Sequence, residues 1–208
     1  EWEQSFTEWQ NSMYAFASRI GLPKAQVHEL EVEDADRAHY SKRTIDFEFD
    51  YPFGRKELWG LAYRTDFDLK AHSETSTKDL SYLDEATNER FIPHVIEPSL
   101  GVDRTILAVL TSAYTTDDLG GETRTYLKLP SEIAPIRAAV FPLLKNKPEL
   151  VEKARTVFLA LKNAGVRVMW DDNGNIGKRY RRQDEIGTPH CVTIDFDTLG
   201  EHPELIDT

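Results

Sequence analysis

Residues 44–51 read TIDFEFDY, and this octapeptide decides what kind of sheet the chain builds. Its apolar residues alternate with polar ones; they are Ile45, Phe47, Phe49 and Tyr51. Successive side chains of a strand point to opposite faces, so the alternation predicts a strand with one buried face. A turn sequence, PFGR at 52–55, and an apolar run, ELWGLAY at 57–63, come next and predict a second strand beside the first.

The flanking stretches predict helices that pack on this sheet. In residues 2–20 the apolar residues recur three or four positions apart, as on one face of a helix; they are Trp2, Phe6, Trp9, Met13, Phe16 and Ile20. A third short strand is expected at 91–96 and an apolar helix at 105–113. This order favours an α+β arrangement in which helices cover an antiparallel sheet.

Beyond residue 130 the pattern changes to alternating strands and helices. Strands are expected at 136–144, 166–170 and 190–196, and helices at 148–164 and 176–184. Such an order is typical of a three-layer α/β unit with a mostly parallel sheet. The fold class expected for the chain is therefore α/β, with one domain at 1–130 and a second at 131–208.

Composition narrows the classes of function. No apolar run approaches the roughly 18 residues of a membrane span, so no membrane partner is expected. A single cysteine, Cys191, excludes a disulfide framework and favours a cytoplasmic protein. The net charge of −11 is uneven: residues 111–182 carry 13 Lys or Arg against 8 Asp or Glu. This basic block suits a phosphate-binding face, although a solvated helix face has the same composition.

Residues 97–104, EPSLGVDR, join an expected strand to an expected helix. Glu97 and Ser99 are two positions apart in the strand, so they share a face. Arg104 falls in the first turn of the helix. A carboxylate for an ammonium group and a guanidinium for a phosphate would then border one pocket. The alternative is a helix-start turn without a ligand.

Two further stretches are candidates for phosphate chemistry. Glu57, at a strand edge, is the kind of carboxylate that lies near Mg²⁺ beside triphosphate oxygens. Residues 174–185, GNIGKRYRRQDE, place glycines before a basic helix, where free backbone N–H groups bind anions. The spacing is neither that of a P-loop nor that of a dinucleotide fingerprint. Tyr180 among the basic residues suits base stacking.

These stretches together resemble the glycyl-tRNA synthetases of the homodimeric, class II type. The matching segments are AHYSKRTIDFEFDYPFGRKELWGLAYRTDFDL, FIPHVIEPSLGVDRTILAVL, APIRAAVFPLLKNKPELVEKA and DDNGNIGKRYRRQDEIGTPHCVTIDFDTL. The resemblance implies that residues 1–130 are the C-terminal part of the catalytic domain, with motif 3, and that 131–208 are an incomplete anticodon-binding domain. It also implies ATP-dependent activation of glycine to glycyl-adenylate, transfer to tRNA(Gly), Mg²⁺, and a homodimer in the full-length enzyme.

The resemblance also implies roles for particular residues. Arg104 and Glu57 would be the catalytic residues, and Glu57 the neighbour of Mg²⁺. Glycine would bind at Glu97, Pro98, Ser99, Leu100 and Gly101. ATP would bind at Glu57, Leu58, Gly101, Val102, Asp103 and Arg104. The tRNA contacts would come from Lys178, Arg179, Arg181 and Arg182.

Motifs 1 and 2 of this family would precede Glu1, so we expect a chain of these 208 residues not to charge tRNA by itself. One alternative is a non-catalytic relative that serves as a nucleic-acid-binding or polymerase-accessory module. Another is a small-molecule α/β enzyme that uses Cys191, although the strand sequence around this residue predicts a buried packing role.

Overall fold

The computed structural model describes residues 2–200, and of Leu119 the backbone alone. The chain forms two compact units. The first contains residues 2–18 and 22–111, and the second contains residues 19–21 and 112–200. No helix of the described residues is long and apolar enough to cross a membrane. The predicted boundary near residue 130 concerns the domains of the protein and stays a prediction.

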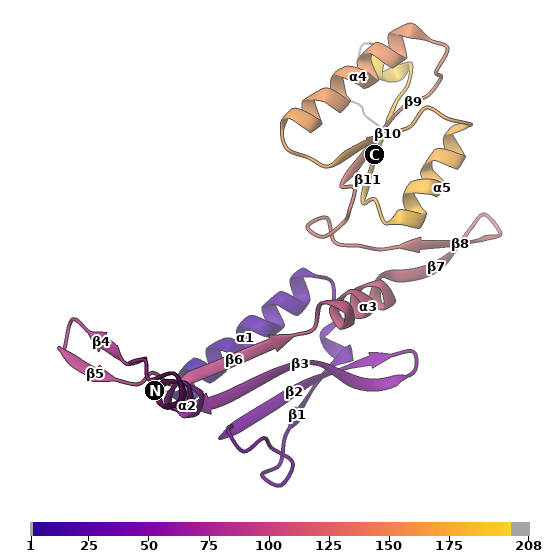
Figure 1. The fold of residues 1–208 in the computed structure, drawn as a ribbon. Helices are drawn as coiled ribbons and strands as arrows, with labels where there is room; N and C mark the ends of the chain where they lie inside the picture. Colours follow the sequence, from indigo (N-terminus) through magenta and orange to yellow (C-terminus); the bar gives the residue numbers. More distant parts are fainter. Residues whose placement is uncertain (1, 201–208) are drawn as a thin grey trace. The chain divides into compact units, whose positions relative to one another are not determined.

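The first unit is built on an antiparallel sheet of four strands in the order β1-β2-β3-β6 (Figure 1). The strands are β1 (Val27–Glu31), β2 (Arg43–Tyr51), β3 (Gly54–Thr65) and β6 (Val95–Leu100). The predicted alternation in β2 is confirmed, because Ile45, Phe47, Phe49 and Tyr51 are all buried. The strand expected at 91–96 is divided instead, with one strand ending at Phe91 and β6 beginning at Val95. Pro93 lies in the interruption and has no N–H for a ladder.

Helix α1 (Trp2–Arg19) packs on the apolar face of this sheet. Its Tyr14 ring contacts Phe47 edge-on at 5.4 Å between centroids, and its Trp2 ring stacks on Tyr63 at 4.2 Å. The helix was predicted with six apolar residues along one face. Phe6 and Met13 are buried, but Trp9 is 45% exposed, because a stripe of spacing three and four does not all fit under one narrow contact.

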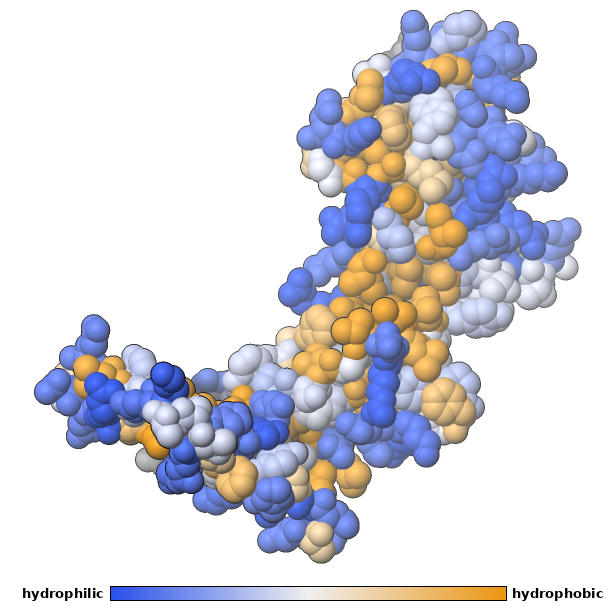
Figure 2. Space-filling model, in the orientation of Figure 1, coloured by the Kyte–Doolittle hydropathy of each residue, from blue (hydrophilic) through white to orange (hydrophobic). Residues whose placement is uncertain are grey.

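The remaining elements of the first unit are short, apart from one helix. They are η1 (Lys24–Gln26), α2 (Phe67–Ser76) and a small hairpin of β4 (Tyr82–Asp84) with β5 (Glu89–Phe91). Helix α3 (Val102–Ala113) follows β6 directly and ends this unit. Apolar residues stay at the surface around α3, where Val102 is 70% and Ile106 52% exposed (Figure 2).

The second unit begins with a hairpin of β7 (Tyr114–Leu119) and β8 (Glu122–Leu127). A parallel sheet in the order β10-β9-β11 follows, from β9 (Ala138–Pro142), β10 (Val168–Trp170) and β11 (His190–Ile194). Helix α4 (Pro148–Asn163) covers one face and α5 (Ile176–Ile186) the other, and η2 (Asp197–Leu199) comes last (Figure 1). The predicted three-layer α/β unit with a parallel sheet is therefore confirmed.

A candidate active-site face and a basic helix

The face of the first sheet that is turned away from α1 is polar. Its central strand, β3, contributes Gly60 and Ala62 to this face. Asp46 of β2 and Ser99 of β6 flank Gly60, and Glu97 of β6 flanks Ala62. Glu97 and Ser99 thus share a face, as their spacing predicted. The small residues between the polar side chains leave a shallow depression, because neither glycine nor alanine rises above the strand.

A β-bulge brings Glu57 to the same face. Strands β2 and β3 are in register at Phe47 and Trp59, and the register shifts so that Glu48 lies opposite Glu57. Leu58 and Trp59 are consecutive and both buried. Without the extra residue Glu57 would follow the parity of Trp59 and point to the core. The bulge re-aims its carboxylate toward the polar face.

Arg64 fixes the carboxylate of Glu97. One guanidinium nitrogen donates to Glu97 Oε2 at 2.6 Å, and two others donate to the oxygens of Asp68 at 2.6 and 3.0 Å. The guanidinium also lies over the Tyr40 ring, 3.9 Å from its centroid. The hydrogen bond from Arg64 lowers the pKa of the Asp68 carboxyl below its usual value, against a smaller opposing effect of burial. Sequence reasoning did not connect Arg64 with Glu97, because 33 residues separate them.

Arg104, in the first turn of α3, reaches back to β3. Its guanidinium donates to the backbone carbonyl and to the Oε2 of Glu57, both at 3.0 Å. The start of α3 is fixed by two bonds from the sheet. The Tyr51 hydroxyl donates to the Arg104 carbonyl at 3.2 Å, and the Trp59 indole donates to Thr105 Oγ1 at 2.8 Å. The two residues expected to be catalytic therefore meet.

A cavity of about 380 Å³ opens beside this ion pair. It is lined by Tyr51, Phe53, Lys56, Glu57, Arg104 and Leu107. The Tyr51 and Phe53 rings stack nearly parallel at 5.1 Å, and Phe53 is 64% exposed. Flat aromatic surface beside two cationic side chains is a chemistry that suits a nucleotide, through its base and its phosphates.

Several residues expected around these ligands can contribute only through their backbone. Pro98 and Leu100 alternate with Glu97 and Ser99, and they lie opposite Leu61 and Trp59 on the apolar side. Their side chains therefore point away from the polar face. Leu58 is 1% exposed, so its side chain belongs to the core. Gly101, Val102 and Asp103 are exposed at the start of α3, next to Arg104.

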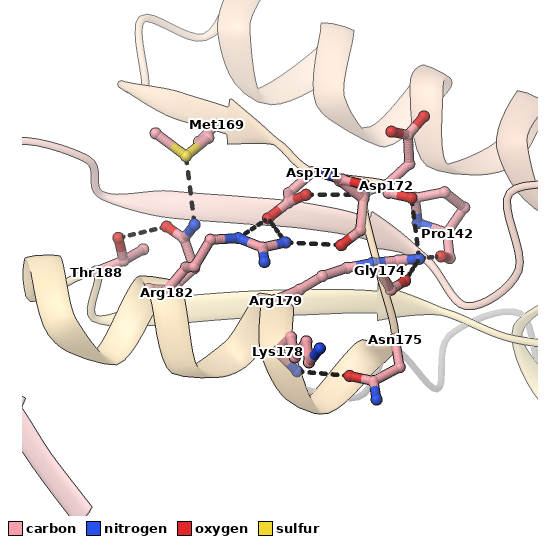
Figure 3. A network of polar contacts seen from close by, with 12 residues as sticks. Pro142, Met169, Asp171, Asp172, Gly174, Asn175, Lys178, Arg179, Arg182 and Thr188 are labelled. Atoms are coloured by element: carbon pink, nitrogen blue, oxygen red, sulfur yellow. Dashed lines mark hydrogen bonds and ion pairs between the residues drawn. The ribbon is translucent and has the colours of Figure 1, made fainter.

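The basic residues of α5 divide into two kinds (Figure 3). Arg179 is 2% exposed and donates to the carbonyl oxygens of Pro142, Asp172 and Gly174 at 2.5, 3.2 and 2.8 Å. Arg182 donates to Asp171 at 2.6 Å. The expectation that Arg179 contacts tRNA is corrected by its burial, since its guanidinium ties the ends of two strands together.

Lys178 and Arg181 are the most exposed members of this group. The Asn175 side chain accepts a hydrogen bond from the backbone N–H of Lys178 at 3.0 Å (Figure 3), and Lys178 is exposed. Arg181 pairs only loosely with Glu185, at 3.6 Å, and its side chain is 66% exposed. Both side chains are placed to meet an anionic partner.

Cys191 does not have the surroundings of a nucleophile. It packs against Ala139 and Phe141 in the core of the second unit. Burial is the main cause that raises the pKa of its thiol to about 11, and the charge of Asp184 adds to it. Within residues 2–200 no group of three or more His, Cys, Asp or Glu is arranged to hold a metal ion.

Comparisons with known proteins show which proteins this chain resembles. Residues 137–204 match the family model described as an anticodon binding domain. A glycine–tRNA ligase of Clostridium acetobutylicum is 47% identical over 207 residues, which are 99% of this chain and 43% of that protein. The glycine–tRNA ligase of Caldanaerobacter subterraneus subsp. tengcongensis is 45% identical over 206 residues, with the same two shares. The chain thus spans less than half the length of these relatives.

A solved structure confirms the fold. The chain aligns with a Giardia lamblia prolyl-tRNA synthetase, determined in complex with prolyl-adenylate, at a TM-score of 0.66 and 18% identity. The alignment covers 94% of this chain and 38% of that one. The fold of this chain is therefore shared with that structure. Over the part of their length that it spans, this chain is recognised as a relative of the glycine–tRNA ligases and carries an anticodon-binding domain at residues 137–204.

Proposed function

We propose that this chain contributes to the charging of tRNA(Gly) with glycine, as part of a homodimeric cytoplasmic glycine–tRNA ligase. The observation that carries the proposal is the gathering of Glu57, Arg104, Glu97 and Ser99 at one polar face. Glu57 comes from a strand 40 or more residues before the stretch 97–104 that supplies the other three, and together they provide an anion-binding and a cation-binding group. The high identity to glycine–tRNA ligases supports the choice of substrates.

In the first step, a carboxylate oxygen of glycine attacks the α-phosphorus of ATP. Pyrophosphate leaves, and glycyl-adenylate forms. Arg104 binds the nucleotide and offsets the charge of its phosphates, while Glu97 and Ser99 hold the ammonium group of glycine. This chemistry needs no protein nucleophile, because positioning and electrostatic stabilisation lower the barrier. In the second step, a terminal ribose hydroxyl of the tRNA attacks the carbonyl carbon, and AMP leaves.

Mg²⁺ fits the residues at the phosphate end of this face. Magnesium prefers oxygen ligands and is commonly held by one or two carboxylates together with substrate phosphates. Glu57 supplies a carboxylate whose oxygen lies 3.0 Å from Arg104, beside the cavity described above. When bound, the ion would neutralise phosphate charge there.

The tRNA contacts are assigned to Lys178 and Arg181 of α5, with Arg179 and Arg182 shaping the preceding loop. A double variant, Lys178→Gln with Arg181→Gln, should lower the slope of log affinity for tRNA(Gly) against log salt by about 1.5. A matched double variant on α4, Arg155→Gln with Lys162→Gln, should leave it unchanged. An equal slope for wild type and the α5 variant would remove α5 from the interface.

A thermal unfolding experiment separates this proposal from a non-catalytic binding module. Ligands that bind only the folded state raise its melting temperature. The 208-residue chain should therefore melt at a higher temperature with ATP, Mg²⁺ and glycine than without them. A binding module that retained only the fold would show no shift with these ligands but would still bind tRNA. That result would favour the alternative.

A further inference from the structure

Asp46 is an acidic side chain of the polar face to which the described residues offer no cation. It is partly buried, and its carboxylate accepts no hydrogen bond and forms no ion pair in the described part of the chain. Burial is the main cause that raises the pKa of this carboxyl, and the like charges of Glu57 and Glu48 add to it. An ionised carboxylate in such surroundings is costly unless a positive group joins it.

The Asp46 carboxylate lies close to Gly60, the residue of the polar face that has no side chain. Asp46 lies opposite Gly60 across one ladder, and Ser99 lies opposite Gly60 across the next. A Cβ added to Gly60 would lie 3.9 Å from Asp46 Oδ1. The space above Gly60, beside the Asp46 carboxylate, is therefore open because this residue has no side chain.

Asp46 and Glu97 line one cavity of about 190 Å³. Ala62 and Thr44 form part of its floor, and residues of the segment 32–40 form its wall. Two arginines also border the cavity, but both are already occupied by other carboxylates. Arg64 binds Asp68 and Glu97, and Arg37 binds Asp34 at 2.7 Å. Neither of them neutralises Asp46.

A primary ammonium group completes this arrangement. It has three N–H donors, and this face of the sheet offers three acceptors: Asp46 and Glu97, which line the cavity, and Ser99, which lies on the same face. We propose that Asp46 is a further ammonium-binding residue, which holds the amino group of glycine together with Glu97 and Ser99. This inference rests on the proposed function and adds to it a residue from outside the EPSLGVDR segment. The small volume of the cavity, and the small side chains of Thr44 and Ala62 that line it, favour a compact amino acid.

The test uses the 208-residue chain and nuclear magnetic resonance titrations of its backbone amides. The probes are glycine, methylamine, which has the ammonium group alone, and acetate, which has the carboxylate alone. Asp46→Asn should weaken the binding of glycine and of methylamine about tenfold and leave any effect of acetate unchanged. The matched control is Glu48→Gln, which removes the same charge two positions along the same face and should change glycine affinity less than twofold.

The outcomes separate this inference from the proposed function. If Glu97→Gln abolishes glycine binding while Asp46→Asn binds as wild type does, Asp46 has no role and the proposed function stands. If wild type shows no glycine-dependent shifts, both are overturned for this chain. A weakened Asp46→Asn variant must retain the amide spectrum of wild type without ligand. Equal weakening by Glu48→Gln would show a general effect of charge and would also overturn the assignment.

Discussion

The guanidinium of Arg104 lies 3.0 Å from two oxygens of Glu57, one of the backbone and one of the carboxylate, across 47 residues of sequence. Both side chains are more than half exposed, at 56% and 53%. An ion pair in such a position adds at most about 1 kcal/mol to the free energy of unfolding. Its value lies in holding the guanidinium at the mouth of the cavity beside Phe53.

The variant Arg104→Gln should therefore lose nucleotide binding while its stability stays close to that of wild type. The melting temperature of the free variant should stay within about 2 °C of wild type, because an exposed pair contributes little. The rise in melting temperature caused by ATP with Mg²⁺ should disappear. Arg90→Gln is the matched control, since Arg90 is 57% exposed and pairs with Asp79. It should keep the full ligand-induced rise, and loss of the rise in both variants would contradict the role of Arg104.

Substitution of Arg179 should mainly lower stability, whereas substitution of Arg181 should mainly weaken tRNA binding, although the two residues are two positions apart on α5. Arg179→Met leaves three carbonyl oxygens without their buried donor and should lower the free energy of unfolding by about 3 kcal/mol. Arg181→Met should change it by about 0.5 kcal/mol or less but should weaken tRNA binding. Hydrogen exchange of the amides of β9, β10 and β11 measures the first effect. Similar exchange in the two variants would contradict the structural role of Arg179.

Cys191 should resist thiol reagents in the folded chain. With a pKa raised to about 11, about one thiol in a thousand is ionised at pH 8, and packing against Phe141 blocks access. Because the raised pKa is above this pH, the thiolate fraction should rise about tenfold for each further pH unit until the pKa is reached. Labelling by iodoacetamide should instead follow unfolding by urea. Rapid labelling without urea would instead support the alternative in which this cysteine is a nucleophile.

The parts of the fold that follow a simple period were predictable from sequence. The alternation at 44–51 and the strand–helix order after residue 130 are both local signals, and both are confirmed. The β7–β8 hairpin was not predicted, because its strands are mostly polar and show no apolar alternation. Its signal was the pair Gly120 and Gly121, whose φ angles of +67° and +89° suit the tight turn.

The site was predictable only in part, because its geometry depends on a β-bulge and on the direction in which individual side chains point. The parity of residues 57–63 places Glu57 with Trp59, and only the bulge puts it on the polar face. The sequence KRYRR shows four cations in a row of five, but not that Arg179 turns inward. That choice is made by carbonyl oxygens at the end of β9 and in the loop after β10, which no local pattern reveals.

The last prediction concerns Arg64, which forms ion pairs with both Asp68 and Glu97. Protonation of Asp68, in α2, should therefore affect both the stability of the chain and the position of Glu97 on the polar face. The pKa of Asp68 is lowered in the folded chain, chiefly by the hydrogen bond from Arg64. The stabilisation is therefore fully present above the unfolded pKa of about 4 and is lost as the pH falls through the lower, folded value.

Melting temperatures measured from pH 7 to pH 2 should show this loss in wild type. In Asp68→Asn the loss should be smaller over the same window, because the titrating group is gone, while the melting temperature at pH 7 should be lower than that of wild type. Asp34→Asn removes a carboxylate whose side chain is 91% exposed and should follow the wild-type curve. Since Arg64 would keep only Glu97 as an anionic partner in Asp68→Asn, glycine affinity should fall too, although Asp68 is not among the residues that line the cavity. An unchanged affinity would show that Glu97 holds its position without Arg64.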